Sequence, residues 1–352
     1  AVLIKAYGSA PRPEGAVLLA TADGRIAGSV SGGCVEAAVV ADICEVRRQG
    51  RARVTGYGFS DETARDAGLA CGGRIDVLVE PGVRREIVEA ATHRGRAVIT
   101  ALPADGATEP ASMVVSEDGT IDGSTRDALV DRALVKAAQE ALEIGRSAVV
   151  EAGQRAYFLE VFARRPRLVI VGAVQVAIPL VSMARTLGYE VIVIDGRSAF
   201  ATAERFPGVD RLIVGWPDEV ASQIALDKAD SVAVLSHDPR FDEPAIAEAL
   251  RRGCRYVGAI GSRRTQADRR TRLTAAGLTQ SDLGPLRGPI GLDLGGRDPA
   301  ETALAIMAEV VAARFGGSGM PMRDRLAGHR SDADGRLQAS RKGDRAAARG
   351  KG

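Results

Sequence analysis

The chain has few of the residues that mark several common protein classes. Its 352 residues include 4 cysteines, 3 histidines and 1 tryptophan, and the formal net charge is only +2. Four cysteines in a chain of this length do not form a disulfide framework, so a reducing cytoplasm is expected. With no CxxC and no cysteine clusters, structural zinc and iron–sulfur sites are not expected either. The balanced charge predicts no nucleic-acid or membrane-surface partner.

Long apolar runs are also missing. No stretch is long enough to cross a bilayer, and no charged-then-apolar signal opens the chain, so no membrane span is expected. The first residue is Ala1 rather than methionine, and we expect further residues upstream. The hydrophobic fraction of 45% can fill real cores, and the length suggests two domains.

Residues 1–164 show the pattern of a mixed α+β domain. Two hairpins are predicted, around Asp23-Gly24 and Asp118-Gly119. Helical spacing of apolar residues begins at Val35 and stops at Gly50, with Ser31 as a candidate cap. The predicted strands cover 1–5, 16–20, 25–29, 51–57, 74–80, 96–102, 147–151 and 156–162, and the predicted helices 35–49, 83–94 and 125–144.

A boundary is predicted at Arg164-Arg165-Pro166. Over residues 165–316 strands alternate with helices, which predicts a Rossmann-like, doubly wound parallel sheet. Residues 317–352 are rich in glycine, arginine and aspartate, and we expect a disordered basic tail. The predicted strands here are 168–171, 190–194, 231–235 and 256–260, and the predicted helices 175–187, 243–252, 263–276 and one from Asp298-Pro299 to about residue 314.

Two cysteines lie among glycines. Residues 28–36 read GSVSGGCVE, so Cys34 follows Gly32 and Gly33 at the start of a helix. Free amides and the helix dipole at such a junction favour a thiolate and can hold a phosphate. Alternatively, the glycines only form a tight turn and Cys34 packs as a small apolar side chain.

The second glycine-flanked cysteine is Cys71, in the sequence GLACGG over residues 68–73. Its flexible, polar surroundings, with Gly72 and Gly73 on one side, favour a functional thiol over a packed one. Cys44 lies inside a predicted helix and Cys254 precedes a strand, so both are expected to be core residues.

The turn at 169–177, VIVGAVQVA, stands where a dinucleotide-binding fingerprint is expected. Gly172 is present, but Val174 replaces the glycine that lets a pyrophosphate approach. Asp195, about 20 residues further on, is a candidate for a ribose hydroxyl, and Arg197 for a phosphate. A Rossmann-like scaffold without a nucleotide site is the alternative.

Two further segments follow strands that end at the same sheet edge. His237 follows the strand 231–235 and is either an acid–base group or a loop residue bonded to the backbone. Residues 258–264, GAIGSRR, form another strand-to-helix turn. Gly261, Ser262 and Arg263 suit a phosphate, although solvated arginines would give the same pattern.

Taken together, these motifs resemble the XdhC/CoxI family of accessory proteins for molybdenum hydroxylases such as xanthine dehydrogenase. The resemblance runs in the family's order from residue 1 to about 315. It rests on GSAPR at 8–12, the two cysteine loops, GAIGSRR at 258–264, PIGLD at 289–293 and PAE at 299–301.

The resemblance implies a non-catalytic chaperone, with no catalytic residue of its own, that carries the molybdopterin cofactor. Such proteins protect the cofactor during sulfuration by a cysteine desulfurase and insert it into the apo-hydroxylase. Cys71 is then the leading cofactor contact, including to molybdenum, and Cys34 the second. Arg12 and the glycine amides would hold the pterin phosphate. A homodimer is the expected assembly.

This chain departs from the family pattern at two positions. Val174-Gln175 stands where Gly-His is usual, which argues against NAD or NADP, and Ala70 replaces a common glycine. A nucleotide-dependent oxidoreductase or redox partner using the Rossmann-like domain is the main alternative function. A third is a component or regulator of a hydroxylase that carries no cofactor itself.

Overall fold

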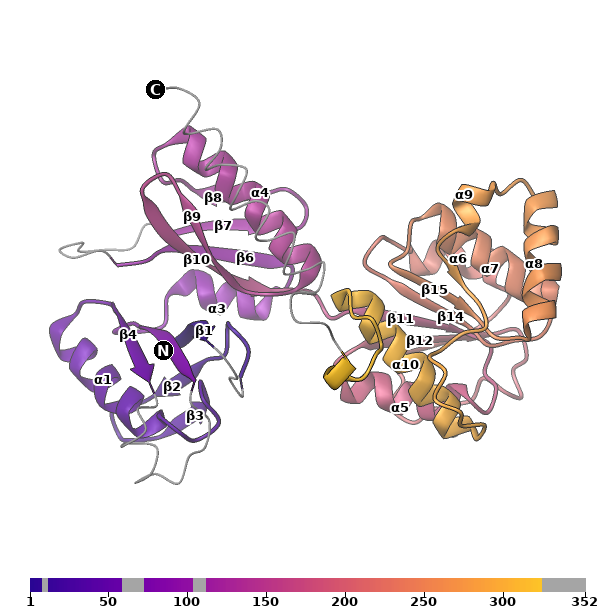
Figure 1. The fold of residues 1–352 in the computed structure, drawn as a ribbon, viewed down its shortest axis with the longest axis horizontal. Helices are drawn as coiled ribbons and strands as arrows, with labels where there is room; N and C mark the ends of the chain where they lie inside the picture. Colours follow the sequence, from indigo (N-terminus) through magenta and orange to yellow (C-terminus); the bar gives the residue numbers. More distant parts are fainter. Residues whose placement is uncertain (8–11, 59–72, 104–111, 325–352) are drawn as a thin grey trace. The chain divides into compact units, whose positions relative to one another are not determined.

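The structure is a computed structural model that describes residues 1–7, 12–58, 73–103 and 112–324. Contacts divide the chain into two compact units, which within the described residues run over 1–164 and from 165 onward. Figure 1 shows both units. The tail predicted for 317–352 lies outside the described residues from 325 on, and Met322–Asp324 form a single 3₁₀ turn.

The first unit contains antiparallel sheets, as expected for an α+β domain. One sheet has the order β1-β5-β4, a second β8-β7-β6-β10-β9, and β2 pairs with β3 in a hairpin. The strands are β1 (Val2–Tyr7), β2 (Leu18–Ala20), β3 (Ile26–Gly28), β4 (Arg53–Gly58), β5 (Arg74–Val79), β6 (Arg96–Ala101), β7 (Ser112–Ser116), β8 (Ile121–Gly123), β9 (Ala148–Ala152) and β10 (Arg155–Phe162). The helices are α1 (Glu36–Gln49), α3 (Arg85–Thr92) and α4 (Ala128–Ile144).

Helical spacing of apolar residues places the helices against these sheets. Helix α1 buries Val39, Ile43 and Val46 in one cluster with residues of β1 and β5. Helix α4 covers the five-stranded sheet, begins at Asp127, whose side chain accepts two backbone amides, and ends at Gly145 with φ 72°. Burial of such stripes, rather than helix propensity, supplies most of the stability of helices this short.

The second unit is a parallel six-stranded sheet with helices on both faces. Its order β13-β12-β11-β14-β15-β16 is that of a Rossmann fold. Strands are added outward from β11 to β13 on one side and from β14 to β16 on the other, and β11 and β14 themselves pair in parallel. The strands are β11 (Arg167–Val171), β12 (Glu190–Asp195), β13 (Arg211–Val214), β14 (Ser231–Val234), β15 (Tyr256–Ala259) and β16 (Leu286–Arg287). This architecture confirms the predicted fold class.

Two helical layers enclose this sheet (Figure 1). Helices α5 and α10 pack on one face, and α6, α7, α8 and α9 on the other. Their bounds are α5 (Ala177–Thr186), α6 (Pro217–Ile224), α7 (Pro239–Arg251), α8 (Arg263–Ala275), α9 (Gln280–Leu283) and α10 (Pro299–Phe315). As predicted, Pro299 occupies the first turn of α10 after Asp298, and Glu301 accepts the Asp298 amide.

Several short elements of the second unit were not predicted from the sequence. Strand β13 is partly exposed, so its apolar pattern is weak, and α6, α9 and β16 are short. Helix α7 begins at Pro239 rather than at the predicted 243, because the Asp238 side chain accepts the Arg240 amide and caps the helix there.

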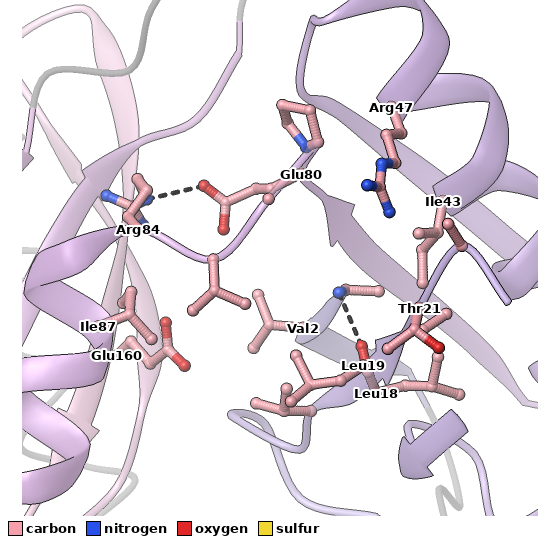
Figure 2. A pocket seen from close by; sticks show the side chains of 17 residues that line it. Val2, Leu18, Leu19, Thr21, Ile43, Arg47, Glu80, Arg84, Ile87 and Glu160 are labelled. Carbon is pink, nitrogen blue, oxygen red and sulfur yellow. Dashed lines mark hydrogen bonds and ion pairs between the residues drawn. The ribbon is translucent and has the colours of Figure 1, made fainter. Parts of the chain in front are cut away.

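A cavity of about 460 Å³ in the first unit is lined by apolar residues of β1, β2 and α1 and by four charged side chains. Figure 2 shows these charged residues, Arg47, Glu80, Arg84 and Glu160, around the cavity. Arg84 forms an ion pair with Glu80 at 2.9 Å. Glu160, on β10, is only 6% exposed. Burial, and then the charge of Glu80, raise the pKa of Glu160 to about 7, although Arg84 opposes this.

Replacing Glu160 by glutamine should stabilise the protein above neutral pH. The folded-state pKa of about 7 lies above the ordinary value of 4.5, so the buried carboxyl favours folding at low pH and loses that contribution as pH rises through 7. The gain of Glu160→Gln in unfolding free energy should be about 2 kcal/mol larger at pH 8 than at pH 5. Urea unfolding at both pH values measures it.

Glu89→Gln serves as the control, because Glu89 forms an exposed pair with Arg85 and its loss should change stability little at either pH. A gain for Glu160→Gln that does not depend on pH would contradict the raised pKa.

Candidate functional site

The first candidate site is the loop that joins β3 to α1. Gly28, the last residue of β3, has φ 81°, and a Cβ added there would lie 2.2 Å from the carbonyl oxygen of Val17, just before β2. Only glycine fits this position, since both the backbone angle and the close approach exclude a side chain. Gly32 and Gly33 also have positive φ, at 81° and 118°.

The Glu36 carboxylate holds this loop together. It accepts the Ser29 hydroxyl at 2.6 Å, the Ser31 amide at 2.9 Å and the Gly33 amide at 2.9 Å. The Ser31 hydroxyl and the Val35 amide donate to it as well. A single side chain thus fixes a loop whose glycines would otherwise leave it flexible.

These hydrogen bonds also set the charge state of Glu36. Partial burial alone would raise its pKa, but the bonds from Ser29 and Ser31 outweigh burial and lower the pKa to about 2. Glu36 is therefore ionised throughout the neutral range.

The loop amides proposed to hold a phosphate already have acceptors within the loop. Gly32 donates to the Ser29 hydroxyl at 2.7 Å, and Cys34 donates to the Ser31 hydroxyl at 3.0 Å. Across 31–35 every described amide is bonded in this way, so a phosphate would have to compete with Glu36. The prediction that Ser31 caps α1 is wrong, because the helix starts after Val35, which has no side-chain cap. The Ser31 hydroxyl instead accepts the Cys34 and Val35 amides within the loop.

Cys34, in the same loop, is a free cysteine and is half-buried. Cys254 is buried, as predicted. The expectation that Cys44 is a core residue is wrong, since Cys44 is exposed. The apolar stripe of α1 runs through Val39, Ile43 and Val46, and Cys44 lies off that stripe.

The second cysteine loop is not part of the described residues, because Cys71 and Gly72 fall in the segment 59–72. Gly73 is described and is buried directly before β5. Arg12 is exposed in the turn after β1. The assignment of these residues to cofactor binding remains a prediction.

The second candidate site is a cleft of about 660 Å³ at the carboxyl edge of the six-stranded sheet. Gly172, with φ 108°, turns the chain there, and a Cβ on it would lie 2.8 Å from the Ser236 amide nitrogen. Val174 follows it and lines the cleft. The β-branched side chain therefore stands on the surface that a pyrophosphate would need.

Asp195 is buried at the end of β12, with 2% exposure. Its carboxylate accepts the Ala173 amide at 2.7 Å and three hydrogens of Arg197, from the backbone at 2.9 Å, Nε at 2.9 Å and Nη2 at 2.7 Å. Burial alone would raise the pKa of Asp195, but the bonds from Arg197 outweigh it and lower the pKa. Four bonds use the acceptor capacity of a carboxylate, so a ribose hydroxyl would have to displace Arg197.

The cleft contains His237, which was predicted, and an aromatic pair that was not. Trp216 and Phe241 both line it, with ring centroids 5.5 Å apart in an edge-to-face arrangement. Trp216 is the only tryptophan of the chain. Trp216 follows β13, a strand that was not predicted from the sequence. Only the rarity of tryptophan in this chain could have drawn attention to this residue.

Gly261, Ser262 and Arg263 are not among the described residues that line this cleft. The Ser262 hydroxyl accepts the Thr265 amide and caps α8. The Gln266 side chain bonds the carbonyls of Ala259 and Ile260 behind this turn. A role of the turn in phosphate binding remains a prediction.

Among the described residues, no group of three or more histidine, cysteine, aspartate or glutamate residues could hold a metal ion. None of the described helices is long and apolar enough to cross a membrane.

Two models of known protein families match the parts of the chain that contain the two candidate sites. A family model described as the XdhC and CoxI family matches residues 1–58, and one described as the XdhC Rossmann domain matches residues 168–310. Together they match more than half of the chain. The chain belongs to the XdhC/CoxI family.

Similar proteins extend this likeness along most of the chain. A Bacillus subtilis protein whose name describes it as a probable xanthine dehydrogenase subunit is 27% identical over 321 residues, 89% of this chain and 92% of that protein. The Escherichia coli protein named molybdenum cofactor insertion chaperone PaoD is 27% identical over 315 residues, 89% of this chain and 82% of that protein.

A crystal structure from Bacillus halodurans, described as a xanthine dehydrogenase, has the same fold. It matches with a TM-score of 0.67 and 22% identity, and the match covers 95% of this chain and 94% of that one. Within the XdhC/CoxI match, the Cys34 loop lies inside the N-terminal family model and the cleft inside the Rossmann model.

Removing the charge of Glu36 should loosen the Cys34 loop. Glu36→Gln keeps the shape but loses an ionised acceptor, so the unfolding free energy should fall by about 2 kcal/mol at pH 7. The ionised form stabilises the fold above about pH 4.5, and this contribution disappears as pH falls toward 2. Chemical unfolding and hydrogen exchange of the amides at 31–35 measure the effect.

Glu45→Gln is the matched control on the same helix, since Glu45 pairs with Arg48 at the surface. Equal exchange rates in Glu36→Gln and the unmodified protein would contradict the role of Glu36.

Gly28→Ala should be far more destabilising than Gly33→Ala. Both positions have positive φ, which costs alanine about 1–2 kcal/mol. Only Gly28 adds a collision with the Val17 carbonyl, whereas nothing lies within 4 Å of a Cβ at Gly33. Thermal unfolding should show at least about 1 kcal/mol between the two variants, and equal losses would exclude the collision.

Proposed function

We propose that this protein is a chaperone for the molybdopterin cofactor of a xanthine dehydrogenase or CO dehydrogenase type of hydroxylase. It binds the finished cofactor as cargo, protects it while a cysteine desulfurase adds the terminal sulfur, and inserts it into the apo-hydroxylase. The proposal includes a cytoplasmic location and a homodimer.

The single observation that carries this proposal is the XdhC/CoxI match over both units of the chain. The full-length similarity to a protein named molybdenum cofactor insertion chaperone supports it. The relative whose name refers to xanthine dehydrogenase points to the same client class.

The geometry of the Cys34 loop suits the handling of such a cargo. A thiolate is a soft ligand that can approach molybdenum. Glu36 fixes the backbone on either side of Cys34, so the thiol is presented at a defined position. Half-burial protects it from bulk oxidants while leaving it open to a ligand.

Cys71 is proposed as the leading contact and Cys34 as the second, with Gly72, Gly73 and Arg12 beside them. Gly261, Ser262 and Arg263 are proposed as a separate contact for phosphate. The alternative function, a nucleotide-dependent oxidoreductase, has the cleft of the Rossmann unit in its favour. Val174 and the saturated carboxylate of Asp195 argue against a dinucleotide there.

Cysteine variants test the proposal through the pterin that the protein retains. The protein is co-expressed with the molybdopterin pathway and purified, and its bound pterin is quantified. We expect Cys71→Ala to abolish retention and Cys34→Ala to lower it at least about tenfold, since a lost metal or charged contact costs about 1.4 kcal/mol or more.

Cys44→Ala is the control, because Cys44 is exposed on α1 away from the loop. Retention unchanged in both Cys34→Ala and Cys71→Ala would remove the thiols from the site. No bound pterin in the unmodified protein would contradict the proposed function itself.

A further inference from the structure

The cleft of the Rossmann unit contains an aromatic surface that has no role in the chaperone function proposed above. Trp216 is 38% exposed, unusually high for the largest apolar side chain. Its indole packs edge-to-face with the Phe241 ring, and a Cβ added to Gly196 would lie 3.5 Å from the indole. The indole is thus held in place with part of its surface open to the cleft.

Arg240 lies over the same indole. Its guanidinium carbon is 5.9 Å from the ring centroid, near the outer limit of a cation–π contact. A flat ring between two planar groups needs roughly 7 Å, or two contact distances of about 3.5 Å. Arg240 is highly exposed, so a small movement of its side chain would admit such a ring.

Two arginines keep hydrogens for an anion in this cleft. Asp195 binds Nε and Nη2 of Arg197, and Asp238 binds Nε and Nη2 of Arg240. Among the contacts of the described residues, Nη1 of each therefore stays available. Arg197, Asp238 and Arg240 all line the cleft. Hydrogen bonds from Arg240, together with the charge of Arg197, lower the pKa of Asp238.

The rest of the cleft limits what can bind. Its volume of about 660 Å³ is typical of small-molecule sites. Val174 crowds the turn that would hold a pyrophosphate, and Arg197 already occupies the acceptors of Asp195. A dinucleotide therefore fits poorly. A ligand with one ring and one phosphate needs neither the turn at Val174 nor the carboxylate of Asp195.

We propose that this cleft binds a planar, nitrogen-containing fused ring that carries one phosphate, with the ring against Trp216 and the phosphate between Arg197 and Arg240. A pterin phosphate and a purine nucleoside monophosphate share this chemistry. This inference rests on the proposed function in one respect: if the ligand is a pterin, it would come from the molybdopterin cofactor that the protein is proposed to bind.

The chain's single tryptophan makes the test direct, since selectively excited tryptophan fluorescence reports on this cleft alone. The full chain is titrated with neopterin monophosphate, GMP, NADP and inorganic phosphate, and affinities are confirmed by calorimetry. We expect at least one of the two ring monophosphates to quench the fluorescence in a saturable way and to bind more tightly than NADP. The relative affinities of neopterin monophosphate and GMP show whether the cleft prefers a pterin or a purine ring.

Variants show whether the aromatic surface is responsible. Trp216→Leu should weaken binding of the ring monophosphate about ten- to a hundredfold by calorimetry, since one stacked base contributes that much. Arg240→Ala should weaken it as well. Leu187→Ala, an exposed apolar residue at the end of α5, is the control and should bind normally.

Four results would each overturn the proposal. They are no quenching by either ring monophosphate, equal quenching by inorganic phosphate, tighter binding of NADP, and unchanged affinity in Trp216→Leu. The titrations contain no molybdenum cofactor, so ring binding in a protein that never retains the cofactor would contradict the carrier function and leave this inference intact.

Discussion

The carboxylate of Glu36 is the interaction on which the N-terminal site depends. Glycines make the loop 28–36 able to turn sharply, but they do not define one conformation. Five donors from the loop converge on Glu36, and this places the Cys34 thiol at the start of α1. Asp195 has a similar role in the second unit. Its carboxylate, at the end of β12, accepts the amide of Ala173 from the turn after β11.

The two carboxylates have the same consequence for ligand binding. Strand-to-helix turns with glycines commonly bind anions through free amides. Here the amides of 31–35 and of Ala173 already have acceptors. In the proposed sites, recognition therefore falls to side chains: a thiol in the first unit, and an indole with two guanidiniums in the second. Such side chains can move, which suits the proposed release of a bound cofactor.

Local sequence signals revealed much of the fold and less of the sites. Asp298-Pro299 gave the start of α10, and the spacing of Val39, Ile43 and Val46 gave the buried face of α1. The same spacing shows why Cys44 is exposed, although its position inside a helix suggested burial. Strand β13 is half exposed and has no clear pattern, so the position of Trp216 beside Arg240 could not be predicted. The convergence of donors on Glu36 likewise exists only in the folded loop.

Transfer of the cofactor tests the central claim most directly. Protein loaded by co-expression with the molybdopterin pathway is mixed with a purified apo-hydroxylase of the xanthine dehydrogenase type, and hydroxylase activity is followed against the pterin transferred. For a cofactor chaperone, we expect activity to appear in proportion to that pterin and faster than with an equal amount of free cofactor. A loaded protein that keeps its pterin, or that activates no better than free cofactor, would contradict it.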